Sequence, residues 1–388
     1  MQRTADVVVI GAGVIGCSTA YHLAQGGIRE VAVVEMGQVG SGSSSKSAAM
    51  LSLQFCSDEL ALRMAKYSYA KYMQFEDEFD IPIDFRKIGW LSLATMESAE
   101  QLRRNAKQLT SYQVPTELLE HEEIRRRYPE INAEDLALGT WGPDDGSFDP
   151  HMIMWGYIQR AREMGVGLYP GVRATGIEIR DGQVEAVQTD QGDVLTNVVV
   201  NAGGPWAIEI GRWAGVEIPI VNLARSIWVT PPFPDLPPNR PFVEDLTAGW
   251  YYRSEGAGFL IGMGTEPTEA LDIEMSHALL DKMIDVAIHR VPLFGRVSIL
   301  TSWTGIRPVT LDERPILGPV PSVKGLFLNC GWGGTGIIQA PIAGNLMAEF
   351  IHNGMTTTFD TSLLRIERFQ GKSHEAARDA WERSRKTK

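Results

Sequence analysis

The stretch Val7-Val8-Val9-Ile10-Gly11-Ala12-Gly13-Val14-Ile15-Gly16 decides the fold of this chain. Its first four residues are β-branched and predict a buried parallel strand, because such strands are apolar on both faces. Residues 17–25 then have apolar side chains at helical spacing and end at Gly26-Gly27, a helix stop. A second buried strand over residues 31–34 is followed by Glu35. The N-terminal segment therefore predicts a complete βαβ unit.

The glycine-rich turn of this unit has the spacing of a dinucleotide-binding site. Gly11 makes the tight turn, Gly13 lets the backbone approach a pyrophosphate at the helix N-terminus, and Gly16 allows the helix to pack closely on the sheet. Glu35 stands where an acid accepts hydrogen bonds from an adenosine ribose, and its charge disfavours a 2′-phosphate. A glycine-rich turn without a ligand is the alternative. We disfavour it because strand, turn, helix and acid occur in the required order.

Two further segments of small residues favour a bound cofactor, but neither segment is sufficient evidence for one by itself. Residues 40–47 place serine hydroxyls and Lys46 in a loop suited to phosphate oxygens, and an ordinary surface loop is the alternative. Residues 198–206 end a buried strand in Ala202-Gly203-Gly204, which lets the backbone approach a cofactor. A β-turn with a packing glycine explains that segment equally well.

A second glycine-rich helix start lies near the other end of the chain. Gly331-Trp332-Gly333-Gly334-Thr335-Gly336 precedes the final long predicted helix. Two such starts predict a long cofactor that touches both ends of the chain. A helix N-terminus directed at a flavin ring stabilises negative charge on the reduced ring, which favours FAD over NAD. For the second motif alone, an ordinary glycine-rich helix start remains the alternative.

The composition limits the classes of function. The 388 residues include 36 Lys and Arg against 48 Asp and Glu, a net charge of −12, which argues against a nucleic-acid partner because phosphate binding needs a basic face. Cys17, Cys56 and Cys330 are too few and too scattered for a disulfide framework or a zinc site, and they predict a reducing, cytoplasmic compartment. The histidines have no metal-ligand spacing, so no metal is predicted. No apolar run reaches the ~18–20 residues that span a bilayer.

Together these motifs resemble the D-amino-acid oxidase superfamily of FAD-dependent oxidoreductases. The resemblance is nearest to the branch of the sarcosine oxidase β-subunit, glycine oxidase and dye-linked proline dehydrogenase. It rests on residues 6–21, on Gly305-Ile306-Arg307-Pro308-Val309-Thr310-x-Asp312 and on residues 331–336, and it extends to about residue 355. It implies an α/β fold (α+β overall) in which a Rossmann-like FAD-binding domain of the glutathione-reductase type contains an inserted mixed β-sheet substrate domain. The FAD-binding domain is expected to be discontinuous and to comprise residues 1–80, 145–222 and 300–370. The substrate domain is expected in two pieces, residues 81–144 and 223–299. The polar tail, residues 371–388, is expected to fray.

The resemblance also implies a reaction and its residues. The reaction is oxidation of a small amino acid or N-alkyl amino acid (sarcosine-, glycine- or proline-like, or a D-amino acid) to an imine, by hydride transfer to flavin N5. Relatives hold the substrate carboxylate with the arginine of a Gly-x-Arg-Pro motif, here Arg307, whose planar fork suits a carboxylate. Tyr251 is the second predicted catalytic residue, chosen by its distance from Gly262. The alternative for Arg307 is a structural ion pair, and the alternative for Tyr251 is an ordinary tyrosine in a strand. The predicted cofactor-binding residues are Gly11, Gly13, Val14, Ile15, Gly16, Glu35, Met36, Ser43, Ser44, Lys46, Ser47, Ala174, Ala202, Gly203, Trp206, Arg307, Gly333, Gly334, Thr335, Gly336 and Ile337.

Several positions depart from the relatives' patterns. Residues 301–318 contain no cysteine, so we expect noncovalent FAD. Ile338 and the apolar segment 258–262 stand where sarcosine oxidases have lysines, and residues 48–52 lack the carboxylate-binding arginine of some relatives.

These departures slightly favour a dehydrogenase subunit, which passes electrons to a partner or dye, over an oxidase that uses O2. A flavin-binding subunit without its own turnover and a nicotinamide dehydrogenase are the remaining alternatives. A homo- or hetero-oligomer is compatible with each.

Overall fold

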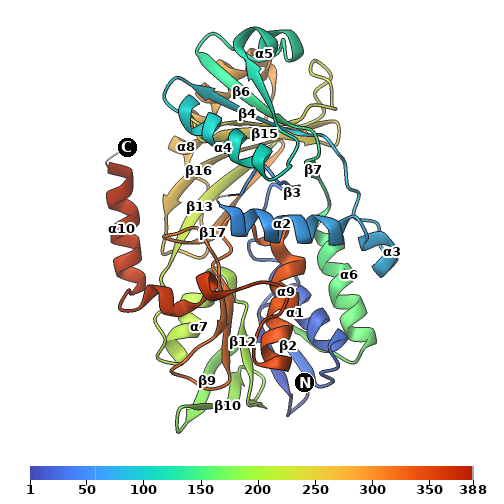
Figure 1. The fold of residues 1–388 in the computed structure, drawn as a ribbon, viewed down its shortest axis with the longest axis vertical. Coiled ribbons are helices and arrows are strands. Elements are labelled where there is room, and N and C mark those ends of the chain that lie inside the picture. The colour runs from blue at the N-terminus through green and yellow to red at the C-terminus, as the bar shows by residue number, and fades with distance from the viewer. Residues whose placement is uncertain (57, 387–388) are drawn as a thin grey trace.

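The computed structural model describes residues 1–56 and 58–386 and has two sheet-centred bodies stacked along its long axis (Figure 1). The lower body in that view contains a six-stranded sheet with the order β18-β19-β12-β1-β2-β8. In that order the strands are Ile316–Pro319, Leu326–Cys330, Val199–Asn201, Val7–Ile10, Val31–Glu35 and Gly167–Pro170. Neighbours pair in parallel except β18 and β19. The predicted βαβ unit is present as β1, α1 (Val14–Gln25) and β2.

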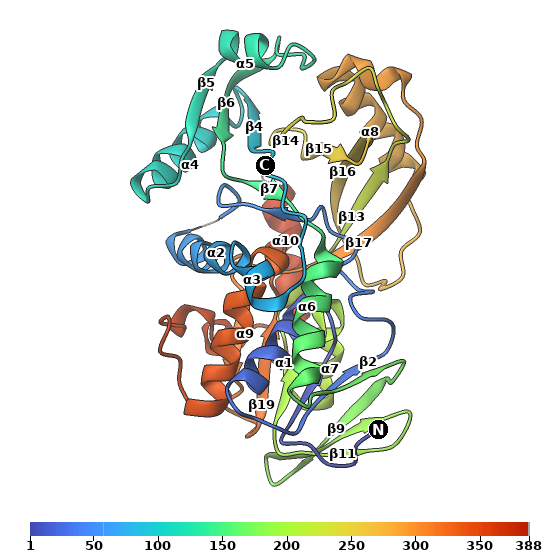
Figure 2. The same ribbon diagram turned by 90° about the vertical axis from the view of Figure 1, so that its right-hand side faces the viewer.

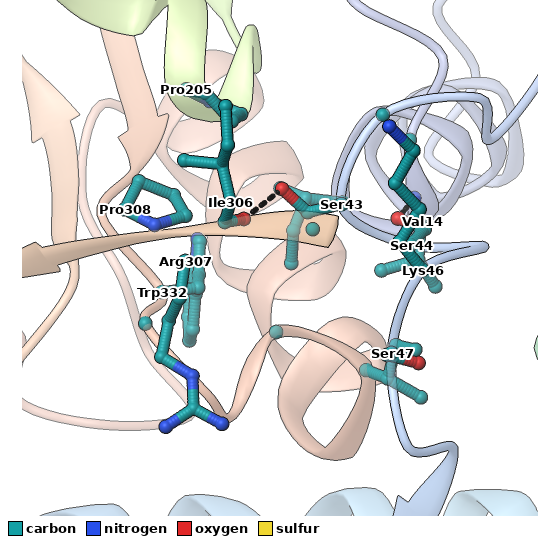
Figure 3. A pocket seen from close by; sticks show the side chains of 18 of the residues that line it. Val14, Ser43, Ser44, Lys46, Ser47, Pro205, Ile306, Arg307, Pro308 and Trp332 are labelled. Atoms are coloured by element: carbon teal, nitrogen blue, oxygen red, sulfur yellow. Dashed lines mark hydrogen bonds between the residues drawn. The ribbon is translucent and has the colours of Figure 1, made fainter. Parts of the chain in front are cut away.

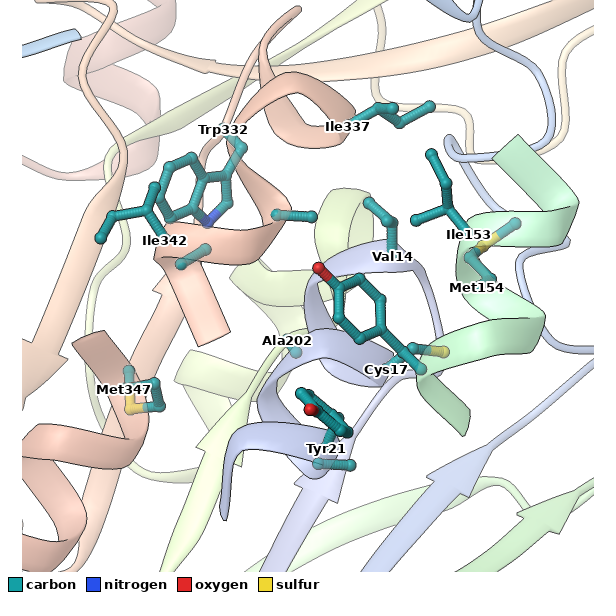
Figure 4. Close-up of a cluster of buried hydrophobic side chains, with 14 of the residues drawn as sticks. Val14, Cys17, Tyr21, Ile153, Met154, Ala202, Trp332, Ile337, Ile342 and Met347 are labelled. Atoms are coloured by element: carbon teal, nitrogen blue, oxygen red, sulfur yellow. The ribbon is translucent and has the colours of Figure 1, made fainter. Parts of the chain in front are cut away.

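Strand β1 is continuously apolar because it is buried on both faces of the sheet. Alternate residues of β1 join hydrophobic cores on opposite sides. On one side α1 packs against α6 (Pro150–Glu163) and α9 (Gly336–Asn353), and α2 (Glu59–Tyr72) packs on α9. Figure 4 shows side chains of α1, α6 and α9 meeting in this core. On the other side lie the helix α7 (Ala207–Trp213) and a three-stranded antiparallel sheet. The strands of that sheet are β9 (Ala174–Arg180), β10 (Gln183–Thr189) and β11 (Val194–Leu195).

The upper body contains a mixed eight-stranded sheet with the order β17-β13-β16-β15-β14-β4-β6-β5. In that order the strands are Thr301–Thr310, Ile220–Val229, Gly258–Pro267, Trp250–Glu255, Phe242–Asp245, Trp90–Thr95, Leu136–Gly142 and Glu117–Glu120. Only the β14–β4 pair is parallel among these described strands, which makes the sheet mixed as predicted. Besides the C-terminal helix and four short 3-10 helices, the other elements described are α3 Phe75–Phe79, α4 Ala99–Ser111, α5 His121–Arg127, α8 His277–Arg290, and the strand pair β3 Met50–Leu51 with β7 Gly146–Ser147.

Strands β13 and β17 pair along all ten residues, from Ile220 opposite Thr310 to Val229 opposite Thr301. They form the edge of the mixed sheet that lies in the middle of the molecule, next to the lower body (Figure 1). Every strand of the six-stranded sheet falls in the ranges predicted for the FAD-binding domain. The predicted domain boundary between residues 222 and 223 falls inside β13. The predicted boundary between residues 299 and 300 assigns β17 to the FAD-binding domain and so separates it from the rest of its sheet. The division into domains remains a prediction.

The expectation that the C-terminal tail frays is wrong for the residues described there. Residues His374–Lys386 form α10, which runs along β13 and β17 in Figures 1 and 2. The imidazole Nδ1 of buried His374 lies 2.6 Å from the carbonyl oxygen of Ile220, and Ala377 is fully buried. Residues 375, 376, 379 and 383 of this helix are exposed, in keeping with its polar sequence, but the contacts of His374 and Ala377 attach it to the sheet. The last two residues of the predicted tail, 387 and 388, lie outside the described residues.

Within residues 1–56 and 58–386, no helix combines the length and the apolar character needed to cross a bilayer. The same residues contain no group of His, Cys, Asp and Glu side chains arranged to hold a metal ion.

Candidate active site

A cavity of about 470 Å³ is lined by residues from both sheets. One end is formed by the glycine-rich turn after β1 and the end of β2, and the other by β13, β14, β15 and β17 of the mixed sheet. The second glycine-rich segment, between β19 and α9, lines it as well. The volume is in the usual range for ligand cavities. Figure 3 shows the middle of this cavity, where the serine-rich loop meets β17.

The first glycine-rich turn has the backbone that its glycines require. Gly11 has φ +105°, and a Cβ there would lie 2.6 Å from the carbonyl oxygen of Ala202. A Cβ on Gly16 would lie 1.9 Å from the carbonyl oxygen of Gly11, so the helix packs against the turn itself. The N-cap residue of α1 is Gly13, which has no side chain to cap the helix, and Ser44 Oγ from the serine-rich loop accepts a hydrogen bond from the Val14 amide. The turn and the start of α1 therefore present backbone to the cavity.

Glu35 at the end of β2 is held by the backbone of the same turn. One carboxylate oxygen accepts a hydrogen bond from Ala12 N–H at 2.8 Å, and the other accepts one from Gly37 N–H at 2.8 Å. The side chain also lines the cavity. These two bonds fix the carboxylate where the sequence places a ribose acceptor.

The serine-rich loop joins the two bodies. Ser43 Oγ donates to the carbonyl oxygen of Ile306 on β17 at 2.5 Å, the dashed line in Figure 3. Ser44 Oγ accepts from Val14 N–H, the first amide of α1, at 3.0 Å. The indole N–H of Trp303 donates to the carbonyl oxygen of Lys46 at 3.3 Å. The loop is thus fixed between the start of α1 and β17, and it is not a free surface loop.

The second glycine-rich segment turns sharply before α9. Gly331 and Gly333 have φ +71° and +54°, the left-handed region that favours glycine. Gly333 N–H donates to the carbonyl oxygen of Pro308 at 2.8 Å, which ties the turn to β17. Thr335 is the N-cap residue of α9, but its hydroxyl donates backwards to Trp332 O at 2.9 Å and makes no cap bond. A second helix therefore begins at the cavity with first-turn amides that no described side chain caps.

One face of the mixed sheet presents a row of polar side chains to the cavity. Arg307 on β17 and Arg225 on β13 are diagonal neighbours in the pairing of those strands. Tyr251 on β15 is directly opposite Glu244 on β14. Tyr251 is also opposite Gly262 on β16, where a Cβ would lie 2.0 Å from the tyrosine ring. The absence of a side chain at Gly262 therefore makes the space that the Tyr251 ring occupies.

Arg307 is a half-buried cation with no counter-ion in direct contact. Within the described residues its guanidinium makes no hydrogen bond and no ion pair; its Cζ lies 5.8 Å from the Phe55 ring centroid. A Cβ on Gly334 would lie 2.9 Å from that Cζ, so glycine at 334 is needed for the arginine to lie where it does. Burial, and then the charge of Arg225, lower the pKa of Arg307 to about 10. The side chain still carries its charge at neutral pH, and an anion bound there would relieve both effects.

Arg225 is held differently. Its Nη1 donates to the carbonyl oxygen of Gly264 at 3.1 Å, and its Cζ lies 4.8 Å from the Tyr251 ring centroid. Its Nε is buried and has no hydrogen-bond partner among the described residues. Two cationic groups therefore line one end of the cavity.

Aromatic rings form the wall beside this polar row. Trp90 stacks on Phe242 with ring centroids 3.9 Å apart, and Phe242 stacks on Tyr251 at 5.1 Å. Phe55 stacks on Trp90 at 5.9 Å from the other side. These rings place apolar surface beside the arginines, and electrostatic interactions are stronger where such surface displaces water.

Every predicted catalytic and cofactor-binding residue lines this cavity except Gly16 and Thr335. Gly16 lies behind the turn, in the helix-packing position predicted for it, and Thr335 is turned away by its bond to Trp332. The cavity therefore brings together residues from the two ends of the chain. Their individual roles remain predictions.

Sequence reasoning missed Arg225, Glu244 and the aromatic residues Phe55, Trp90 and Phe242, all of which line the cavity. Phe242 and Glu244 are two residues apart on β14, which indicates a shared face, whereas Arg225 and Trp90 lie on other strands and Phe55 lies outside the strands. That signal does not say which strands are neighbours, and only the register of the sheet brings these side chains together.

Residues 6–350 match the family model described as FAD dependent oxidoreductase (DAO), and the chain belongs to this family. Sarcosine dehydrogenase, mitochondrial, of Mus musculus is 30% identical over 374 residues, covering 91% of this chain and 40% of that protein. The chain thus spans about two fifths of the length of that curated relative.

Two solved structures are similar over nearly the whole chain. L-proline dehydrogenase from P. horikoshii has a TM-score of 0.85 at 26% identity, covering 99% of each chain. Glycine oxidase from Geobacillus kaustophilus has a TM-score of 0.85 at 27% identity, covering 95% of this chain and 100% of that one. These findings confirm the predicted family and fold class.

The described residues fit the FAD that the family implies. The glycine turn and the start of α1 suit a pyrophosphate, Glu35 a ribose, and the uncapped start of α9 a ring that becomes negative on reduction. At Gly13, a Cβ would come within 3.3 Å of Ser44 Oγ and narrow this cradle. The residues that would hold FAD are therefore those lining the lower part of the cavity.

Proposed function

We propose that the protein oxidises a small amino acid or N-alkyl amino acid to an imine, with the substrate carboxylate bound at Arg307. The observation that carries this proposal is the uncompensated guanidinium of Arg307 in the same cavity as both glycine-rich turns. The printed names of the similar proteins, which concern sarcosine, proline and glycine, agree with such a substrate.

The residues of this chain position the substrate in the proposed reaction. The guanidinium of Arg307 donates two parallel hydrogen bonds to the carboxylate, and the Tyr251 hydroxyl donates a third. The stacked rings of Trp90, Phe242 and Phe55 exclude water and limit the size of the substrate. FAD, when bound, supplies the hydride acceptor. Alignment of the bound amino acid accounts for much of the catalysis.

We infer that FAD is held without a covalent bond. Cys330 lies at the end of β19 and lines the cavity, but it is almost fully buried. Burial raises the pKa of its thiol to about 12, so the nucleophilic thiolate is scarce at neutral pH. Denaturation in acid should release all of the flavin into the supernatant, and flavin retained by the precipitated protein would contradict this.

We favour a dehydrogenase, which passes electrons to a partner or dye, over an oxidase that passes them to O2. Lys46 is the single lysine among the described residues that line the cavity, and it lies in the predicted phosphate loop. Residues 258–262 are buried and apolar, and Ile338 is buried. Mixing the photoreduced protein with air in a stopped-flow instrument separates the versions. A dehydrogenase reoxidises no faster than free reduced flavin, whereas much faster reoxidation indicates an oxidase.

We also retain the prediction of a reducing compartment. Cys17, Cys56 and Cys330 are free thiols in the described structure.

An anaerobic titration tests the proposed reaction. The purified protein is mixed with glycine, sarcosine, L- and D-proline, hydroxyprolines and other D-amino acids while the visible spectrum is recorded. Bleaching of the flavin bands by one of them supports the proposal, and trapping of the imine or its hydrolysis product identifies the chemistry. Yellow protein that none of them bleaches contradicts the proposed substrate class.

A further inference from the structure

Glu244 places a carboxyl group in the part of the cavity that the arginines occupy. It lies on β14, opposite Tyr251 on β15 and Ser92 on β4, and its side chain lines the cavity. The adjacent Asp245 is on the opposite face of the sheet, where it accepts a hydrogen bond from Arg290 at 2.9 Å. Strand alternation thus directs one acid of this pair to the cavity and the other to a structural ion pair.

Positive charge faces Glu244 from two elements. Arg225 on β13 and Arg307 on β17 act on its carboxyl group, and the Trp90 indole N–H on β4, which donates to Ser92 Oγ at 2.9 Å, also favours its charged form. Tyr251 on β15 stands between Glu244 and the Arg225 guanidinium, which stacks over the tyrosine ring. The charge of the adjacent Asp245 acts on Glu244 in the opposite sense and raises its pKa further. Burial raises the pKa of Glu244 above its ordinary value, and the two arginines oppose that rise.

The proposed oxidation requires removal of a proton as well as a hydride. An alkylammonium has a pKa of about 10, so about one amino acid in a thousand has a neutral amine at pH 7. The nitrogen lone pair must be free before a hydride can leave the adjacent carbon. A carboxylate beside the bound ammonium removes this obstacle, because the proton then leaves within the complex.

We propose that Glu244 binds the substrate ammonium opposite the carboxylate held by Arg307 and accepts its proton. The inference rests on the proposed function. In the first step the ammonium N–H bond breaks and the proton moves to a Glu244 carboxylate oxygen, leaving a neutral amine and a carboxylic acid. In the second step a C–H bond on a carbon next to the nitrogen would break as the nitrogen lone pair forms the C=N bond of an iminium ion, and FAD, when bound, would supply the hydride acceptor. The cavity thus has a cationic end for the carboxylate and an acidic side for the amine, and it selects α-amino acids over simple carboxylates.

A purely structural role for Glu244, as a partner of Arg225, makes different predictions. Loss of a carboxylate that only offsets the charge of Arg225 would affect every ligand to a similar degree at every pH. Proton acceptance affects amines alone, and its effect depends on pH.

The experiment measures flavin reduction in the stopped-flow instrument between pH 6 and 10, in the wild type, Glu244→Gln and Glu120→Gln. The probes are sarcosine, glycine and L-proline, and the one that reduces the wild type fastest is followed. Glu120 is an exposed acid on β5 of the same sheet and does not line the cavity, so it serves as the matched control. Methoxyacetate, in which an ether oxygen replaces the amine of sarcosine, is titrated against the flavin spectrum in parallel.

For the wild type we expect the rate constant of flavin reduction divided by the substrate dissociation constant (kred/Kd) to fall at low pH, where Glu244 is protonated, and to be level once Glu244 is ionised. For Glu244→Gln we expect kred/Kd to rise about tenfold per pH unit up to about pH 10, with a loss of up to about 1000-fold at pH 7. Near pH 10 it should approach the wild-type value, which also shows that the variant is folded. Glu120→Gln should follow the wild type, and methoxyacetate should bind Glu244→Gln at least as tightly as wild type.

A wild-type pH profile for Glu244→Gln overturns the role of Glu244 and leaves the proposed function standing. A constant loss at every pH, together with weaker methoxyacetate binding, assigns Glu244 a structural role and also overturns the proposal. Failure of all three probes to reduce the wild type contradicts the proposed function, and the inference about Glu244 fails with it.

Discussion

Replacement of Arg307 by alanine should abolish tight binding of carboxylates while FAD stays bound. Within the described residues, no acidic side chain forms an ion pair with Arg307, so its charge is available for a ligand. Truncating one partner of a buried charge pair costs about 2–5 kcal/mol, which corresponds to about 30- to 5000-fold in Kd. We expect the lower half of this range, because Arg225 lies next to the site and its charge persists.

The same substitution should not lower the melting temperature of the protein. Arg307 makes no hydrogen bond or ion pair with the described residues, and the charge of Arg225 together with burial disfavours its cation. Removing an unpaired, partly desolvated cation costs the folded state little packing beyond the contact with Phe55. Carboxylate binding should therefore be lost without a matching loss of stability.

The assay combines two ligands and two further variants. Methoxyacetate binding is followed by the flavin spectrum, and anaerobic reduction is followed with sarcosine, glycine and L-proline. Arg307→Lys keeps the charge but loses the planar fork, so its affinity should lie between wild type and Arg307→Ala. Arg212→Ala, on the exposed face of α7, should match the wild type. Wild-type affinity and reduction rate in Arg307→Ala, with FAD bound, would refute the assignment of Arg307.

Three further predictions follow from the lower part of the cavity and its surroundings. Gly16→Ala should yield protein without flavin, because a Cβ would lie 1.9 Å from Gly11 O; a wild-type ratio of flavin to protein absorbance would contradict this. Glu35→Ala should raise the Kd of the apoprotein for FAD by about 10- to 100-fold, since a charged acceptor bonded to Ala12 N–H is lost, and an unchanged titration would count against the ribose assignment. Burial raises the pKa of Asp145 from 3.8 to about 7 in the folded protein. The folded state therefore binds this proton more tightly than the unfolded state. The resulting stabilisation is complete below about pH 4 and is lost as the pH rises through 7. Between pH 5 and 7 the free energy of unfolding should therefore fall by up to ~1.4 kcal/mol per pH unit more in wild type than in Asp145→Asn, and parallel urea-denaturation profiles would show otherwise.

The cofactor half of the site could be predicted from the sequence because its signals are local. Gly11, Gly13, Gly16 and Glu35 lie within one βαβ unit, so their spacing along the chain already determines their spacing in space. Arg307 could be found in the same way, through the short motif around it. Each of these residues depends on its immediate neighbours in the sequence.

The substrate half could not be predicted in this way. Arg225 and Glu244 lie on strands that are separated in the sheet by β16 and β15, and only the register of four strands directs both to one cavity. Helix α10 was missed for a related reason. Its polar sequence indicates solvent exposure, and the few contacts that attach it, such as His374 to Ile220, join residues far apart in the chain.

The most direct test of the account is the position of a bound carboxylate in a crystal structure of the oxidised, FAD-containing protein with methoxyacetate. We predict that both carboxylate oxygens lie within hydrogen-bond distance, about 2.8 Å, of the Arg307 guanidinium, and that the ether oxygen lies on the side of Glu244. The flavin ring should face this ligand beside the start of α9. A carboxylate bound elsewhere, or a flavin whose ring lies away from Arg307, would contradict the account.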